Sequence, residues 1–149
     1  MACPYFYPVE RFQPREWSTP PRLPLGDPYH GMCLVNPTRE IRPEMAVLRQ
    51  YCNQGYARGK CPQFPKEAGP DAVRFMVAGD QNDVLQLQYL VEKAHAPLEH
   101  GPLEYSVANS RFLVGHSNEL LRRQAQAYAE SYLRRKTDPQ TRAHHPHRR

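Results

Sequence analysis

Prolines divide this chain into two different kinds of sequence. Twelve of the sixteen prolines fall in residues 1–70, together with five of the eight glycines. Because proline fixes φ and lacks a backbone N–H, it interrupts long helices and interior strands. Regular elements are therefore not expected to dominate residues 1–70. Aromatic residues nevertheless recur there, which is unusual for a disordered linker, so we expect an ordered, extended wrap.

The aliphatic content of the chain is low for a self-sufficient core. Leu, Ile, Val and Phe together account for 28 of the 149 residues, and Ile41 is the single isoleucine. That fraction, about 19 %, lies just under the level at which disorder becomes a concern. The net charge of +5 is modest. We therefore expect a small core that needs a further stabiliser: a metal site, disulfides or a partner.

Two patterns in the second half of the chain predict regular structure. Apolar residues alternate with polar ones on both sides of the turn-forming segment 79–83, which favours a β-hairpin over a helix beginning at Asp83. Pro97 and Pro102 are expected to bracket a polar turn, followed by a third strand or a helix from Leu103. A helix capped by Ser117 or Asn118 is predicted next, with an apolar stripe at Leu121, Ala125, Tyr128 and Tyr132.

These elements predict an α+β fold. A small, hairpin-based antiparallel sheet would pack on the C-terminal helix, and the proline-rich N-terminal half would wrap around a metal site. We expect a single domain at residues 1–136, made of a Pro/Cys-rich half (1–70) and a hairpin-plus-helix half (71–136). Residues 137–149, rich in arginine and histidine, are expected to form a disordered tail.

All four cysteines lie in the proline-rich half, at Cys3, Cys33, Cys52 and Cys61. A [4Fe–4S] cluster needs four thiolates, which can come from distant segments because the cluster is larger than one ion. Glycines between the last two cysteines would let backbone N–H groups approach sulfur, and the nearby Arg58 and Lys60 would offset the cluster's negative charge. The sequence therefore predicts a [4Fe–4S] cluster on these four residues.

Other uses of the cysteines remain open from the sequence. Zinc accepts four thiolates, but its sites usually contain a C-x₂₋₄-C pair, for which His30 and Cys33 are the nearest substitute. The cysteines could also be unrelated buried residues or form disulfides, which the absence of a secretory signal disfavours. A cysteine nucleophile would need a base, and no motif joins a cysteine to His95, His100 or His116.

Charge and hydropathy limit the location and the partners. Residues 134–149 hold six Lys/Arg and one acidic residue, so the basic charge is concentrated in the tail, which could contact nucleic acid or an acidic protein. No run of 18 apolar residues is present, so no membrane span is expected. The N-terminus lacks a basic region followed by an apolar run, so we expect a cytoplasmic protein with reduced thiols.

Together these features predict a small iron–sulfur protein with an electron-transfer, redox-sensing or structural accessory role and a protein partner. With four cysteine ligands no iron would be vacant for substrate, which argues against an enzyme. The histidines and carboxylates of residues 95–105 could serve acid–base chemistry, but a polar turn is the preferred interpretation. The alternative function is a zinc-stabilised module whose basic tail contacts nucleic acid or an acidic partner.

Overall fold

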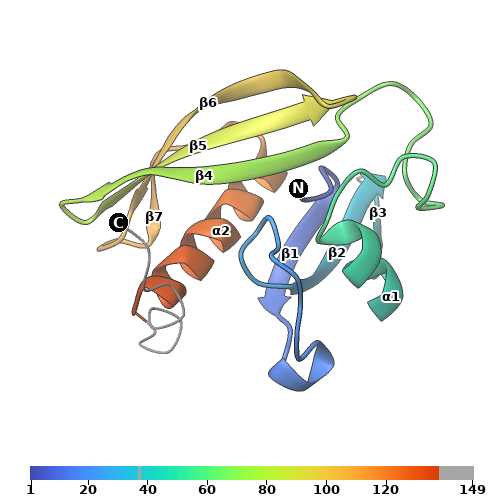
Figure 1. Ribbon diagram of the computed structural model, residues 1–149. Coiled ribbons are helices and arrows are strands. Elements are labelled where there is room, and N and C mark those ends of the chain that lie inside the picture. Colours follow the sequence, from blue (N-terminus) through green and yellow to red (C-terminus); the bar gives the residue numbers. More distant parts are fainter. Residues whose placement is uncertain (37, 138–149) are drawn as a thin grey trace.

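The computed structural model describes residues 1–36 and 38–137, which form an α+β fold with two antiparallel sheets and a C-terminal helix (Figure 1). The first sheet has the order β1-β2-β3 and the second the order β4-β5-β6-β7. The α+β class predicted from the sequence is therefore confirmed. The basic tail lies outside the described residues, apart from Thr137, which ends the C-terminal helix.

The proline-rich half contains more regular structure than the sequence suggested. It forms β1 (Phe6–Arg11), β2 (Tyr29–Asn36) and β3 (Arg39–Ile41), with a short 3₁₀ turn, η1 (Pro14–Glu16), after β1. Regular elements nevertheless do not dominate residues 1–70, as predicted. Pro8 is accommodated because it lies in an edge strand, where its missing N–H need not break the sheet. The pairing with β2 shifts register just after Pro8.

A short helical segment follows β3 and includes the third cysteine. Helix α1 (Met45–Val47) continues directly into a π-helical turn, η2 (Leu48–Cys52), in which the Asn53 N–H bonds to the Leu48 carbonyl at 3.1 Å. Gly55 follows with φ +75, where a Cβ atom would lie 2.1 Å from the Met1 carbonyl oxygen. Glycine is therefore required for the chain to turn there.

The predicted hairpin is confirmed in the second half. Strands β4 (Ala72–Gln81) and β5 (Val84–Lys93) pair along almost their whole length, and the two turn residues Asn82 and Asp83 have φ near +60. Such left-handed backbone at both central residues matches the right-handed twist of a tight hairpin. The competing helix from Asp83 is absent from the described structure.

The polar turn predicted within residues 95–105 was wrong, whereas a strand at Leu103 is confirmed. Instead of a polar turn, these residues belong mostly to β6 (Ala96–Ser106), which pairs with β5 throughout. Pro97 and Pro102 are accommodated because the last strand, β7 (Arg111–Val114), pairs only with residues 104–106, leaving the first part of β6 as a sheet edge. The sequence analysis did not predict β7.

The C-terminal helix α2 (Glu119–Thr137) packs against both sheets (Figure 1). The Asn118 side chain caps it by accepting the Leu121 N–H at 3.1 Å, as predicted. On one side Tyr128 packs on Phe75 of β4, with ring centroids 5.7 Å apart. On the other, the Arg123 guanidinium donates to the Pro8 and Val9 carbonyls of β1. None of the described helices combines the length and apolar character needed to span a membrane.

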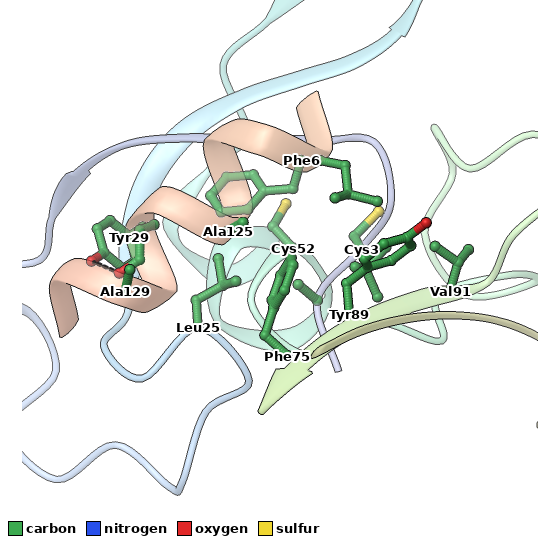
Figure 2. Packing of buried hydrophobic residues seen from close by; sticks show 14 of the residues in the cluster. Cys3, Phe6, Leu25, Tyr29, Cys52, Phe75, Tyr89, Val91, Ala125 and Ala129 are labelled. Carbon is green, nitrogen blue, oxygen red and sulfur yellow. Dashed lines mark hydrogen bonds between the residues drawn. The ribbon is translucent and has the colours of Figure 1, made fainter. Parts of the chain in front are cut away.

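One buried cluster connects the two halves of the chain. Figure 2 shows Cys3 and Cys52 within it, among Phe6 of β1, Leu25 of the following loop and Phe75 of β4. Because these residues come from both sheets, the described residues share a single core rather than two. The two buried cysteines are part of that core, which places the predicted site at the junction of the halves.

Candidate metal centre

All four cysteines line one cavity, although 58 residues separate the first from the last along the chain. The cavity has a volume of about 300 Å³ and is otherwise lined mainly by apolar side chains, among them Val35, Ile41, Val47 and Phe64. The cysteines are all free thiols. Cys3 and Cys52 are buried, whereas Cys33 and Cys61 are half-exposed. The cavity therefore has a buried wall and a wall that reaches the surface.

Cys3 is held in place by backbone and side-chain hydrogen bonds. The preceding residue, Ala2, forms two backbone hydrogen bonds with Val73 of β4, at 2.7 and 2.8 Å, and the Cys3 N–H donates to the Cys52 carbonyl at 3.1 Å. From α2, the buried Gln124 amide donates to the carbonyls of Cys3 and Phe6, at 2.8 and 2.7 Å. The first cysteine is thus tied to the second sheet, the π-helical turn and α2.

Cys33 and Cys52 are brought together by a buried asparagine. Cys33 lies in β2 between its partners Phe6 and Ile41, and Cys52 ends η2. Asn53 accepts the Tyr29 N–H at 3.0 Å and donates to the carbonyls of Tyr29 and Leu48, at 3.1 and 2.9 Å. Three hydrogen bonds from one side chain therefore fasten the start of β2 to the turn that carries Cys52.

Cys61 lies in a loop that Arg58 organises. The Arg58 guanidinium donates to the Asp71 carboxylate at 2.7 Å and to the carbonyls of Pro65, Glu67 and Gly69. The Asp71 carboxylate also accepts the Ala94 N–H at 2.7 Å, so the loop is fixed to the β5–β6 connection. Neither Arg58 nor Lys60 lines the cavity. Arg58 is a structural latch in this arrangement, not the direct electrostatic partner that the sequence suggested.

Burial raises the pKa values of three of the thiols, those of Cys3, Cys33 and Cys52. The pKa of Cys3 is raised to about 12, mainly by burial. The neighbouring Cys33 and Cys61 contribute to the rise, while N–H donors from Tyr5 and Phe6 act in the opposite direction. The other three cysteines all contribute to the rise in the pKa of Cys52. The four thiols therefore influence one another electrostatically within one cavity.

The raised pKa values disfavour nucleophilic chemistry, which needs a thiolate and a nearby base. His95 stacks on Tyr56 with ring centroids 4.2 Å apart, and His116 bonds to Glu99 at 2.5 Å. His100 is exposed on β6. None of the three lines the cavity, so no cysteine–histidine pair forms there among the described residues.

His30, the residue nearest in sequence to completing a zinc-ligand pair with Cys33, does not face the cysteine cavity. The His30 imidazole bonds to the Glu16 carboxylate at 3.0 Å and packs on Phe12, with ring centroids 4.4 Å apart. It is not among the cavity-lining residues. Within residues 1–36 and 38–137, no group of three or more His, Cys, Asp or Glu side chains is arranged to hold a metal ion as it stands. That result disfavours a preformed single-ion site.

The cavity nevertheless has several properties that a cluster needs. Its four thiols come from separate segments, as ligands of four separate irons can. N–H groups of Tyr5, Phe6 and Val35 donate to cysteine sulfur, and such donors stabilise thiolates and tune cluster potentials. The four cysteines therefore match a [4Fe–4S] group in number and in ligand chemistry, and they line one cavity.

Sequence reasoning missed two residues that position the cysteines. Asn53 and Gln124 are fully buried polar side chains whose hydrogen bonds go to the backbone around Tyr29, Leu48, Cys3 and Phe6. Asn53 directly follows Cys52, which was the available signal. Gln124 interrupts the apolar stripe of α2, but only the folded chain shows that it faces Cys3.

Comparison of the chain with protein-family models, with curated proteins and with solved structures found no match in any of the three. The functional argument consequently depends on the site itself.

Proposed function

We propose that this chain is a small iron–sulfur protein in which Cys3, Cys33, Cys52 and Cys61 hold a [4Fe–4S] cluster. The observation that carries the proposal is the convergence of these four cysteines, far apart in the sequence, on one cavity of about 300 Å³. Cysteines buried only for packing have no reason to gather from four different segments. A cluster gives each of them a separate iron to bind.

Burial disfavours thiolate formation at Cys3, Cys33 and Cys52, so a bound cluster would have to offset that cost with its own positive charge. Raised pKa values mean that the metal-free site would hold neutral thiols, and metal binding would release their protons. The N–H donors of Tyr5, Phe6 and Val35 then stabilise the sulfur charge that remains. The cost of thiolate formation is therefore offset by the metal and by the backbone together.

The four cysteine ligands favour electron transfer, redox sensing or a structural role over substrate activation. When bound, a [4Fe–4S] group supplies one-electron redox chemistry. The half-exposed Cys33 and Cys61 mark the side on which a protein partner would approach, because Cys3 and Cys52 are buried. Arg42, Glu44 and Gln63 surround that side and give it a mixed polar rim.

Anaerobic purification followed by metal analysis tests the proposal. The expected result is a visible absorption band at the wavelength typical of [4Fe–4S] proteins, with four irons and four sulfides per chain. A colourless protein with one zinc per chain would replace the cluster with the zinc alternative. A folded protein containing neither iron nor zinc would refute the metal centre altogether.

A matched pair of variants links the metal to the cysteines. Cys61→Ser should remove iron and colour, because it takes away one ligand. Tyr29→Phe removes hydrogen bonds to Ala127, Ser131 and Arg134, which lie on α2 and outside the cavity. It should therefore lower stability by about 1 kcal/mol and leave the iron content unchanged.

A further inference from the structure

A second cavity lies between the C-terminal half of α2, strand β4 and the loop at residues 22–26. Its volume is about 990 Å³, at the upper end of the range for small-molecule sites, and it shares no lining residue with the cysteine cavity. We name it the α2–β4 groove. The groove is therefore a separate feature that the metal centre does not explain.

One wall of the α2–β4 groove is a single face of α2. Tyr128, Tyr132, Arg135 and Lys136 all line it, and their spacings of four, three and one residues place them along one side of a helix. Tyr132 is held by a hydrogen bond from its hydroxyl to Asp80 at 3.0 Å. Aromatic and cationic side chains are therefore interleaved on the same surface.

The other walls come from β4 and from the loop at residues 22–26, which precedes β2. Arg74, Phe75 and Val77 belong to β4, which is the edge strand of its sheet. The loop approaches α2 closely at Gly26, where φ is +90 and a Cβ atom would lie 2.6 Å from the Cβ of Ser131. Arg135 donates to the Gly26 carbonyl and to Asp27, which fixes the loop against the helix.

Among the residues that the structure describes, the groove is lined by cationic side chains and by no carboxylate. Arg135 and Lys136 are already paired, with Asp27 at 3.3 Å and Asp80 at 2.8 Å. Arg22 and Arg74 are exposed and form no hydrogen bond or ion pair within residues 1–36 and 38–137. Two exposed arginines, whose guanidinium groups suit phosphate oxygens, are thus among the lining residues of one aromatic groove.

We propose that the α2–β4 groove binds a nucleotide, with phosphate on Arg22 and Arg74 and the base against the tyrosine face of α2. Positively charged grooves with aromatic side chains are the common way to bind a base and its phosphate together without sequence preference. A purely apolar ligand would leave the guanidinium groups unused, and a simple inorganic anion would leave the aromatic wall unused. A free nucleotide and a single-stranded nucleic acid both present this chemistry.

Binding to the full-length, metal-loaded chain tests the proposal with two probes. The first is ATP, followed by isothermal titration calorimetry, and the second is a short fluorescein-labelled oligothymidine, followed by anisotropy at low salt. Arg22→Gln and Arg74→Gln should each weaken binding about tenfold or more, because each removes a charged hydrogen-bond donor. Arg11→Gln and Arg111→Gln, which remove exposed arginines outside the groove, should leave the affinity unchanged.

The tyrosine face is tested in the same assays. Tyr128→Leu should weaken binding about tenfold through lost stacking, while its far-ultraviolet circular dichroism and iron content stay those of the parent chain. Groove-dependent binding of ATP alone assigns a free nucleotide as the ligand, and groove-dependent binding of the oligonucleotide assigns a single strand. Either result supports the proposal.

Three results would overturn it: no binding of either probe, equal binding by the arginine variants and the parent, or loss of binding only when residues 138–149 are deleted. The last result would assign binding to the basic tail. The metal content measured on the same samples keeps this test separate from that of the iron–sulfur cluster, because the groove needs no cysteine.

Discussion

The two halves of this chain become ordered in different ways. In residues 71–137, two ten-residue strands pair by a tight hairpin turn, and a 19-residue helix follows. In residues 1–70, the strands have only six, eight and three residues. The second half is built mainly from neighbours in sequence, whereas the first half depends on contacts with distant residues. The comparison shows that the first half is held by contacts with α2 and β4, to which the proposed cluster would add a further link.

Loss of a cysteine ligand should have the largest effect and should affect the two halves unequally. Cys52→Ser removes a proposed ligand that is buried and whose backbone carbonyl accepts the Cys3 N–H. We expect loss of iron and a fall of about 4 kcal/mol or more in the free energy of unfolding. Iron analysis and urea unfolding measure both. Unchanged stability in the variant would show that the first half does not need the site.

A cavity in the second half should affect stability without emptying the metal centre. Leu87 is fully buried in the middle of β5, so Leu87→Ala should lower the free energy of unfolding by about 3 kcal/mol. Iron per folded chain should stay at the parent value, because Leu87 does not line the cysteine cavity. Loss of iron in the folded Leu87→Ala variant would contradict the expectation that the cysteine cavity does not depend on the packing of β5.

Breaking the link from α2 to Cys3 should have an intermediate effect. Gln124→Met keeps the side-chain size but leaves the carbonyls of Cys3 and Phe6 without their buried donor, at a cost of about 2 kcal/mol. Iron should also dissociate faster when a chelator is added. Gln126→Met, which loses a bond to Glu130 on the same helix, is the matched control and should release iron at the parent rate.

The Arg58–Asp71 latch should give the smallest effect, and one that depends on pH. Burial alone would raise the pKa of Asp71, but the Ala94 N–H and the Arg58 guanidinium outweigh it and lower the pKa overall. A lowered folded-state pKa contributes stability above the unfolded value of about 4, and that contribution disappears as the pH falls through the folded pKa.

Asp71→Asn should consequently be less stable than the parent by about 1 kcal/mol at pH 7, and the difference should shrink towards pH 3. Urea midpoints measured at several pH values give this difference directly. Asp83→Asn, in the exposed β4–β5 turn, serves as the control for removal of one carboxylate. A difference at Asp71 that stays constant from pH 7 to pH 3 would contradict the assigned pKa direction.

Much of the second half could be predicted from its sequence because its signals are local. Alternation around Gly79–Asp83 specified the hairpin, and Asn118 with the apolar stripe specified α2. Pro97 and Pro102 misled the prediction of β6, because proline is tolerated wherever a strand is an edge, and edges are set by topology. The sequence of a strand does not by itself determine whether the strand pairs on one side or on both.

The arrangement of the first half could be predicted less well, because it depends on contacts between residues far apart in the sequence. The four cysteines could be picked out as a set, but nothing in their spacing required them to line one cavity. That arrangement depends on Ala2 pairing with Val73 and on Gln124 reaching Cys3, which are contacts across 71 and 121 residues. Arg58 was assigned to the cluster from its sequence position, yet its hydrogen bonds go to Asp71 and the loop carbonyls.

Hydrogen exchange in the metal-loaded and metal-free chain tests the central claim most directly. The account predicts that removing iron with a chelator will expose the amides of β1, β2 and η2 to exchange, while those of β4 and β5 remain protected. Native exchange followed by mass spectrometry reads both regions in one sample. Equal protection of β1, β2 and η2 with and without metal would contradict the claim that the four cysteines hold a cluster on which the first half depends.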